Sequence, residues 1–327
     1  MRKELLEDNY FIFDRSVEIS WKYYVKSIFY FFNSLWYKLL MNLKKPEIKT
    51  KKYKVAICAI FKNEALYLRE WIEYHKIVGV EHFYLYNNNS EDNYEEVLKP
   101  YIANGSVTLT QWPQNQAQMK CYHNAIERFF SETEWLTFID IDEFIVPNST
   151  DNIYDFLKPF QKNRPVVIAY WRMFGTSGMI SRDPKNLVSE DLTVCWNKYV
   201  NIGKVFFNTA YDFNKKDKHN NILHHLSWAV LNKTALPPVN IFDKVCTFGK
   251  NRVASNTDAQ YFPLQINHYF TKTYDEYLQK KAKGDVYFKI NPHDESYFYR
   301  HEMKNQSVDY HIFKYLIKLK LALGISK

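Results

Sequence analysis

Short apolar runs alternate with longer amphipathic segments through the first half of the chain. Such runs are typical of strands buried in a parallel sheet, and apolar residues at helical spacing are typical of amphipathic helices. The pattern predicts strands at 55–60, 82–88, 107–112 and from 135 onward. It predicts helices at 63–79, 91–105 and 116–130. This alternation predicts an α/β fold with a doubly wound, mostly parallel sheet, whose ligands bind beyond the carboxyl ends of the strands.

The pattern becomes less regular after Pro147. A strand is expected at 165–175, followed by a turn at Gly175–Gly178. A helix is expected to begin near Ser189, and another at 274–284. We therefore divide the chain into three parts: an aromatic and basic N-terminal segment with its linker (1–50), the α/β domain (51–290) and a basic C-terminal helix region (291–327).

The two ends of the chain are basic and partly apolar. The segment Tyr23–Lys45 is rich in aromatic residues, but its uncharged stretch between Lys26 and Lys38 is shorter than the roughly 20 residues that span a bilayer. We interpret it as a helix at a membrane interface, with packing on the domain as the alternative. For the amphipathic segment 310–327, contact with a membrane surface and docking on the domain both remain open.

The composition adds a basic charge and many aromatic residues. The net charge is +8, the pI is about 9.0, and 18% of residues are aromatic. This charge favours an anionic partner, such as a nucleotide or lipid head group, although a lysine-rich surface also serves solubility. The basic residues are scattered or near the ends, which argues against a nucleic-acid binder. Four separated cysteines predict reduced thiols and hence a cytoplasmic location.

Two carboxylates follow the fourth apolar run, in "WLTFIDIDEFIVP". Residues at i and i+2 of a strand face the same side, so Asp140 and Asp142 are expected to point together beyond the sheet. Carboxylates in such a place bind hard cations, and Mg²⁺ or Mn²⁺ is the expected cofactor. The alternative is a solvated strand end whose acids cap the next turn.

Several blocks resemble glycosyltransferase family 92 and its bacterial relatives. They are "AIFKNEALYLREWIEYHKIVGVEHFYLYNNNSED", "QMKCYHNAIE", "WLTFIDIDEFIVP", "WRMFGTSG" and "INHYFTKTYDEYLQKKAKG", within Lys54–Gly284. The resemblance implies a GT-A fold, which is Rossmann-like with added terminal helices. It also implies an inverting, metal-dependent transfer of a sugar, galactose being the best guess, from a UDP-sugar to a glycan or glycolipid. A bacterial member would extend a surface polysaccharide or lipopolysaccharide at the inner face of the cytoplasmic membrane.

The resemblance also implies roles for individual residues. The metal ligands are Asp140, Asp142 and His268. The donor-binding residues are Phe61, Asn63, Glu64, Asn88, Asp92, Gln118, Lys120, Asn124 and Asp140. The acceptor-binding residues are Trp171, Phe174 and His225. The general base is Asp191, with Glu190 as its rival. Helix capping, turn chemistry, core packing and surface solvation are the simpler explanations for many of these residues.

Three other functions compete with this interpretation. A haloacid dehalogenase-type phosphotransferase also places two aspartates after an apolar strand, but on the first strand of its domain, and with Thr or Val where Phe144 stands here. A nucleic-acid binder has only the net charge in its favour. A catalytically inactive GT-A scaffold is opposed by the intact aspartate pair and His268.

Overall fold

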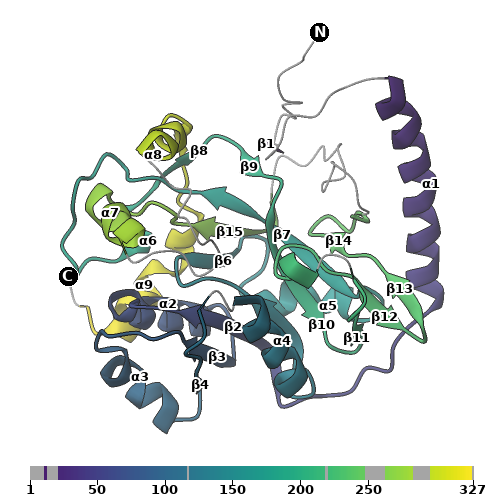
Figure 1. Ribbon diagram of the computed structural model, residues 1–327, viewed down its shortest axis with the longest axis horizontal. Helices are drawn as coiled ribbons and strands as arrows, with labels where there is room; N and C mark the ends of the chain where they lie inside the picture. The colour runs from purple at the N-terminus through teal and green to yellow at the C-terminus, as the bar shows by residue number, and fades with distance from the viewer. Residues whose placement is uncertain are drawn as a thin grey trace.

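The computed structural model of this chain describes residues 11–12, 21–115, 118–217, 220–246, 262–282 and 295–325. Its centre is a nine-stranded sheet with the order β4-β3-β2-β5-β10-β7-β15-β6 and β14 beside β7 (Figure 1). The strands of this sheet are β2 (Tyr53–Phe61), β3 (His82–Asn87), β4 (Val107–Gln111), β5 (Thr133–Phe138), β6 (Glu143–Pro147), β7 (Val166–Met173), β10 (Gly203–Asn208), β14 (Val239–Asn240) and β15 (Leu264–His268).

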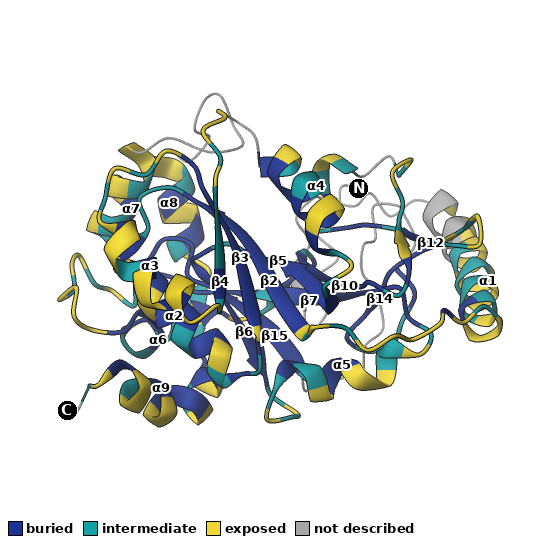
Figure 2. Ribbon diagram, turned by 90° about the horizontal axis from the view of Figure 1, so that it is seen from below, coloured by how far each residue is buried: buried dark blue, intermediate teal, exposed yellow. Residues whose placement is uncertain are grey.

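Helices cover both faces of the sheet. Figure 2 shows α2, α3 and α9 on one side and α4 and α5 on the other. The helices are α1 (Trp21–Leu43), α2 (Ala65–Ile77), α3 (Tyr94–Ala103), α4 (Gln118–Phe129), α5 (Ile153–Gln161), α6 (Val188–Asp191), α7 (Tyr274–Ala282), α8 (Glu295–Glu302) and α9 (Leu316–Leu323). Two short 3-10 helices are η1 (Asn220–Ile222) and η2 (His311–Tyr315). The smaller sheets pair β1 (Phe11–Ile12) with β9 (Tyr199–Val200), β8 (Val194–Trp196) with β16 (Asn305–Val308), and β12 (Ala229–Leu231) with β11 (Asp212–Phe213) and β13 (Thr234–Leu236).

The first half of the sheet is parallel, as the apolar pattern predicts. Strand β2 pairs in parallel with β3 and β5, and β3 pairs in parallel with β4. Residues 55–61 are all buried, because helices on both faces exclude water from β2. The α/β prediction is therefore confirmed. Strand β10 then joins antiparallel to β5 and β7, and β6 joins antiparallel to β15.

A glycine permits the close approach of β10 to β7. A Cβ atom on Gly203 would lie 1.7 Å from the carbonyl oxygen of Ala169. Any larger residue at this position would push the two strands apart. The next residue along β10 is Lys204, so this contact also fixes where that lysine enters the sheet.

Two predictions about local structure are wrong. Strand β5 ends at Phe138 and β6 begins at Glu143, so Asp140 and Asp142 lie in a turn and strand alternation does not set their directions. The indole N–H of Trp71 donates to the carbonyl oxygens of Asp140 and Glu143 and so holds this turn from α2. The helix expected from Ser189 is the single turn α6, because residues 194–196 extend to pair with β16.

The C-terminal helix is docked on the domain. Leu316, Leu319 and Leu323 are buried, and α9 packs against α2. The hydroxyl of Tyr315 donates to the carbonyl oxygen of Pro147 at 2.7 Å. For one face of this helix the docking alternative is therefore confirmed, and the predicted boundary at 290/291 lies outside the described residues. Within the described ranges, no helix has the length and hydropathy that crossing a membrane requires.

Candidate functional site

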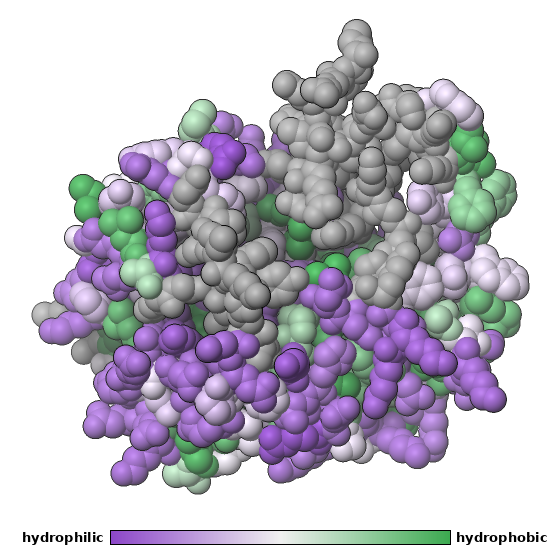
Figure 3. All heavy atoms as spheres, viewed as in Figure 1, coloured by the Kyte–Doolittle hydropathy of each residue, from purple (hydrophilic) through white to green (hydrophobic). Residues whose placement is uncertain are grey.

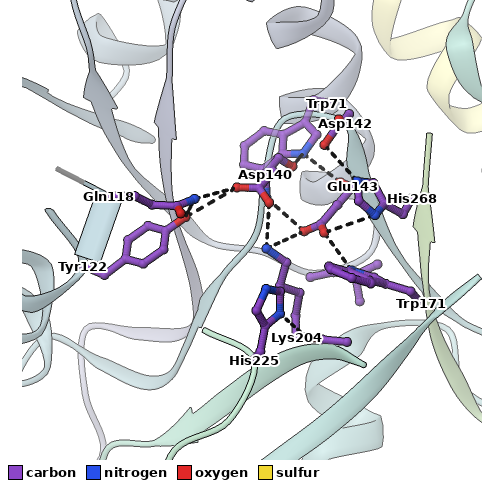
Figure 4. Close-up of polar contacts among 12 residues, drawn as sticks. Trp71, Gln118, Tyr122, Asp140, Asp142, Glu143, Trp171, Lys204, His225 and His268 are labelled. Carbon is purple, nitrogen blue, oxygen red and sulfur yellow. Dashed lines mark hydrogen bonds and ion pairs between the residues drawn. The ribbon is translucent and has the colours of Figure 1, made fainter. Parts of the chain in front are cut away.

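A buried lysine organises the turn between β5 and β6. The Nζ atom of Lys204 lies 2.7 Å from Oδ2 of Asp140 and 3.2 Å from Oε2 of Glu143 (Figure 4). The Lys204 side chain is fully buried, where an unpaired charge would cost several kcal/mol or more. Burial alone would lower the pKa of Lys204, but the two carboxylates outweigh burial and raise it. The lysine therefore stays charged inside the protein.

Glu143 is held from three sides. Its Oε1 accepts a hydrogen bond from Nε1 of Trp171 at 2.7 Å, and its Oε2 accepts one from the backbone N–H of Asp140 at 3.0 Å. Burial raises the pKa of Glu143 to about 7, with Asp140 and Asp142 adding to the rise and Lys204 opposing it. Glu143 is thus a carboxyl group that gains or loses a proton near neutral pH.

Asp142 points away from Lys204, toward β15 and α7. Its Oδ2 lies 2.5 Å from Nζ of Lys280, and its Oδ1 lies 3.6 Å from Nε2 of His268. Burial alone would raise the pKa of Asp142, but Lys280 and His268 outweigh burial and hold that pKa well below its usual range. Asp142 is therefore an ionised carboxylate in a buried place.

The expected donor residues of β2 and β3 lie together at the ends of these strands. Oδ1 of Asn63 accepts from the backbone N–H of Glu91, and Oδ2 of Asp92 accepts from the backbone N–H of Ala65. The side chain of Asn88 donates to the carbonyl oxygens of Trp112 and Gln114. These bonds join the three loops that follow β2, β3 and β4 into one rim. The asparagines therefore make the loop-stabilising hydrogen bonds that were the simpler explanation for their presence.

Of the other expected donor residues, one lies beside Asp140, and the rest have other partners or are exposed. We call Asp140, Asp142, Glu143, Lys204, His268 and Lys280 the cluster. Nε2 of Gln118 lies 3.4 Å from Oδ1 of Asp140, so this residue borders the cluster. Oδ1 of Asn124 accepts from the hydroxyl of Tyr86, and Lys120 is exposed. Phe61 is buried, and its ring packs on that of Tyr94 at 5.6 Å. An oxygen of Glu64 lies 3.8 Å from Nζ of Lys272.

Two of the three expected acceptor residues border the cluster. The ring of Trp171 lies 5.0 Å from that of His225 and 4.8 Å from that of His268. Nδ1 of His225 is 2.7 Å from the carbonyl oxygen of Gly203, on the strand that carries Lys204. Phe174 is fully buried against Tyr269, so its ring has no exposed face of the kind that sugar stacking requires.

The two candidate bases lie on α6. The carboxylate of Glu70 on α2 accepts from the backbone N–H groups of Val188 and Ser189 and so caps this short helix. Glu190 pairs with Lys320 of α9 at 2.5 Å, and Oδ2 of Asp191 is buried without a hydrogen bond. Among the residues that the structure describes, neither carboxylate contacts the cluster.

Several residues of the site were missed by sequence reasoning. Lys204, Lys280 and Lys272 each place a cation near one of the carboxylates. The amine of Lys272 also lies 3.9 Å from the centre of the Tyr67 ring. A signal did exist for Lys204, since "GKVFFN" is a lysine inside an apolar run, and such a lysine needs a buried partner. For Lys280 no local signal distinguishes it from neighbouring lysines.

The arrangement of these side chains suits a divalent cation only in part. Within the described ranges, no three His, Cys, Asp or Glu side chains form a metal-binding group, and Asp140 turns to Lys204, away from Asp142. Asp142 and His268 do converge, because Nε2 of His268 lies 3.6 Å from Oδ1 of Asp142, whereas its Nδ1 lies on the side of Glu143. Magnesium-type ions at phosphate-transfer sites take one or two carboxylates and complete their shell with substrate phosphates and water. The pair Asp142 and His268 suits such a shared site.

A model of glycosyltransferase family 92 matches residues 51–315. The glycosyltransferase family 92 protein RCOM_0530710 of Ricinus communis is 32% identical over 161 residues, which are 47% of this chain and 28% of that protein. The galactan beta-1,4-galactosyltransferase GALS3 of Arabidopsis thaliana is 34% identical over 114 residues, which are 30% of this chain and 22% of that protein. The matches thus span less than a third of the length of these relatives.

Solved structures give a weaker likeness. The S. aureus TarS 1–349 structure is 15% identical, with a TM-score of 0.35, and the match covers 56% of this chain and 59% of that one. The same protein in complex with UDP-GlcNAc is 14% identical with a TM-score of 0.35, and covers 62% of each chain.

Proposed function

Because the chain belongs to glycosyltransferase family 92 and has that family's GT-A-type α/β fold, we propose that it transfers a sugar from a UDP-sugar to a glycan or lipid-linked glycan. Galactose is the proposed sugar, which the similarity to a galactan galactosyltransferase supports. The proposed setting is the synthesis of a bacterial surface polysaccharide or lipopolysaccharide at the inner face of the cytoplasmic membrane. The chain's own residues supply the arguments that follow.

The buried carboxylate of Asp142 carries this proposal. It lies at the carboxyl-end edge of the parallel strands, where ligands of such sheets bind. Two basic side chains keep it ionised, so a cation that binds there finds a negatively charged protein group. Asp142 and His268 would hold Mg²⁺ or Mn²⁺, and a bound divalent ion would offset negative charge on the departing diphosphate.

Lysines around the same edge suit a diphosphate. Lys280 reaches Asp142 from α7, and its side chain is 39% exposed, so it is accessible to a ligand. Lys272 lies nearby in sequence and contacts the first strand-to-helix loop through Glu64. Lysine binds phosphate as a compact point charge. Both lysines therefore offer positive charge on the α7 side of the proposed donor site.

The remaining residues are proposed to bind the acceptor and to remove the proton of its attacking hydroxyl. Trp171 and His225 border the cluster from β7 and the segment after η1, and an indole face is a suitable platform for a sugar ring. An inverting transfer needs a base that removes the proton of the attacking hydroxyl. Asp191 is the proposed base, because the carboxylate of its rival Glu190 is already paired with Lys320.

Calorimetric titration of UDP tests the proposal, with and without Mn²⁺. We expect UDP to bind the wild-type protein, and Mn²⁺ to tighten binding at least about tenfold. Asp142→Asn should lose the effect of Mn²⁺. The matched control is Asp151→Asn, which alters a carboxylate that is 90% exposed and pairs with Lys314 on the surface. The absence of UDP binding under both conditions would contradict the donor assignment.

A further inference from the structure

Helix α1 lies at one end of the long axis of the molecule, with much of its length set off from the domain (Figure 1). Its C-terminal part is anchored. The ring of Tyr37 packs on Trp228 at 5.4 Å, Met41 is fully buried, and Nζ of Lys38 lies 2.8 Å from the Asp243 carboxylate. These contacts define which face of the helix is turned toward the protein.

The opposite face of α1 is apolar and exposed. Large apolar side chains at least half exposed recur at helical spacing, and we call them the outer stripe. They are Trp21, Val25, Ile28, Phe29, Phe32, Leu35, Trp36, Leu39 and Leu43. At 3.6 residues per turn they fall within about one third of the helix circumference, along about 33 Å. Phe31 is also 61% exposed and lies beside this stripe, not in it. Figure 3 shows hydrophobic residues gathered on this edge of the molecule.

The apolar residues of α1 are not confined to the face that packs on the protein. A surface helix normally turns its apolar stripe to the core and its polar residues to water. Here the helical spacing places Tyr37 and Met41 opposite the outer stripe, and polar Ser34 and Lys38 also lie on or beside the protein-facing side. Exposed apolar surface of this extent marks an interaction site. The outer stripe therefore has a partner of its own.

The charge of α1 identifies the partner. Besides Lys38, which pairs with Asp243, the sequence of α1 contains Lys22 and Lys26 and no Asp or Glu, and Lys45 follows the helix. Basic residues beside an aromatic apolar face suit a surface of anionic lipids, and Trp is favoured at the boundary of head groups and acyl chains. Pairing with α1 of a second copy would instead bring lysines together without an acidic residue on either helix. We infer that α1 lies in the surface of a membrane containing anionic lipids, with the outer stripe inserted.

Helix α9 offers a matched control. Ile317 and Leu321 on α9 are 69% and 73% exposed, so they resemble the outer stripe in exposure and character. Figures 1 and 2 both place α9 at the end of the molecule opposite to α1. A membrane surface under α1 is therefore out of reach of α9.

Vesicle flotation of the full chain tests this inference. The vesicles are phosphatidylcholine alone, or phosphatidylcholine with about 30% phosphatidylglycerol. We expect the wild-type protein to float with the anionic vesicles and much less with the neutral ones. Phe29→Glu/Phe32→Glu should reduce flotation at least about tenfold. Ile317→Glu/Leu321→Glu should leave it within about twofold, since α9 faces elsewhere. Unchanged thermal unfolding and UDP binding of the α1 variant would show that it is folded.

Two results would overturn the inference. Flotation that survives Phe29→Glu/Phe32→Glu, or that Ile317→Glu/Leu321→Glu abolishes, would assign membrane contact to another surface. The second result is a dimer that forms through α1, which light scattering after gel filtration would detect. A wild-type dimer that the α1 variant converts to monomer, together with no flotation, would assign the outer stripe to a second copy of the chain.

Discussion

The cluster around Lys204 and the outer stripe of α1 depart from ordinary burial in opposite directions. In the cluster, charged groups lie inside the protein, and each is paired: Lys204 with Asp140 and Glu143, and Asp142 with Lys280. On α1, large apolar side chains lie outside, on the face opposite to Tyr37 and Met41, which pack on the protein. Positions that break a local rule of folding are expected at functional sites. In the cluster, the charges are paired within the protein before any ligand binds. The apolar side chains of the outer stripe are covered only when α1 binds another surface.

The largest expected effect is on the free energy of unfolding, which should differ between substitutions in the two regions. Lys204→Met removes the buried cation and leaves Asp140 and Glu143 facing each other without it. We expect the free energy of unfolding to fall by about 3–5 kcal/mol, as when one partner of a buried ion pair is removed. Phe32→Glu on α1 should change it by less than about 0.5 kcal/mol, because that side chain is 63% exposed. Urea unfolding measures both, and equal effects would contradict the contrast.

A smaller effect concerns the base. Asp191→Asn should lower kcat for sugar transfer about 100-fold, since proton removal by a positioned carboxylate is lost. The KM for the donor should change little, because Asp191 has no contact with the cluster in the described residues. Glu190→Gln is the matched control and should stay within about twofold. A larger loss in Glu190→Gln than in Asp191→Asn would exchange their roles.

The smallest effect is a pH dependence. Because the folded pKa of Glu143 is raised from 4.5 to about 7, the folded state holds more protons than the unfolded state between these values. The contribution of Glu143 to stability is therefore present at low pH and is lost as pH rises through about 7. We expect the Tm of the wild type to fall between pH 5 and 8 relative to that of Glu143→Gln. Parallel Tm curves would show that Glu143 does not titrate in this range.

The sequence predicted the elements that local pattern determines. The buried run at 55–60 identified β2, and helical spacing with a following glycine identified α2. The turn that holds Asp140 and Asp142 was missed, because it depends on the Trp71 indole, which is 69 positions from Asp140 in the chain. The expected helix at Ser189 was shortened by pairing with β16, a strand more than 100 positions away.

The chemistry of the site was only partly predictable for the same reason. The aspartate pair and His268 are recognisable as a motif, and the structure places Asp142 beside His268. The lysines that pair with the aspartates lie 64 and 138 positions away in the chain, so no local spacing in the sequence predicts these pairs. For Phe174 the sequence left sugar stacking and core packing open, and the fold buries its ring against Tyr269. Long-range packing decides such cases.

The measurement that tests the central claim most directly is anomalous X-ray diffraction from crystals grown with UDP and Mn²⁺. We expect one manganese peak within about 2.2 Å of an oxygen of Asp142 and of Nε2 of His268, with the diphosphate beside it. We also expect Lys280 to leave Asp142, where it now lies 2.5 Å away, and to turn to the phosphates. UDP bound elsewhere, or bound at this edge with Lys280 still on Asp142 and no manganese peak, would contradict the account.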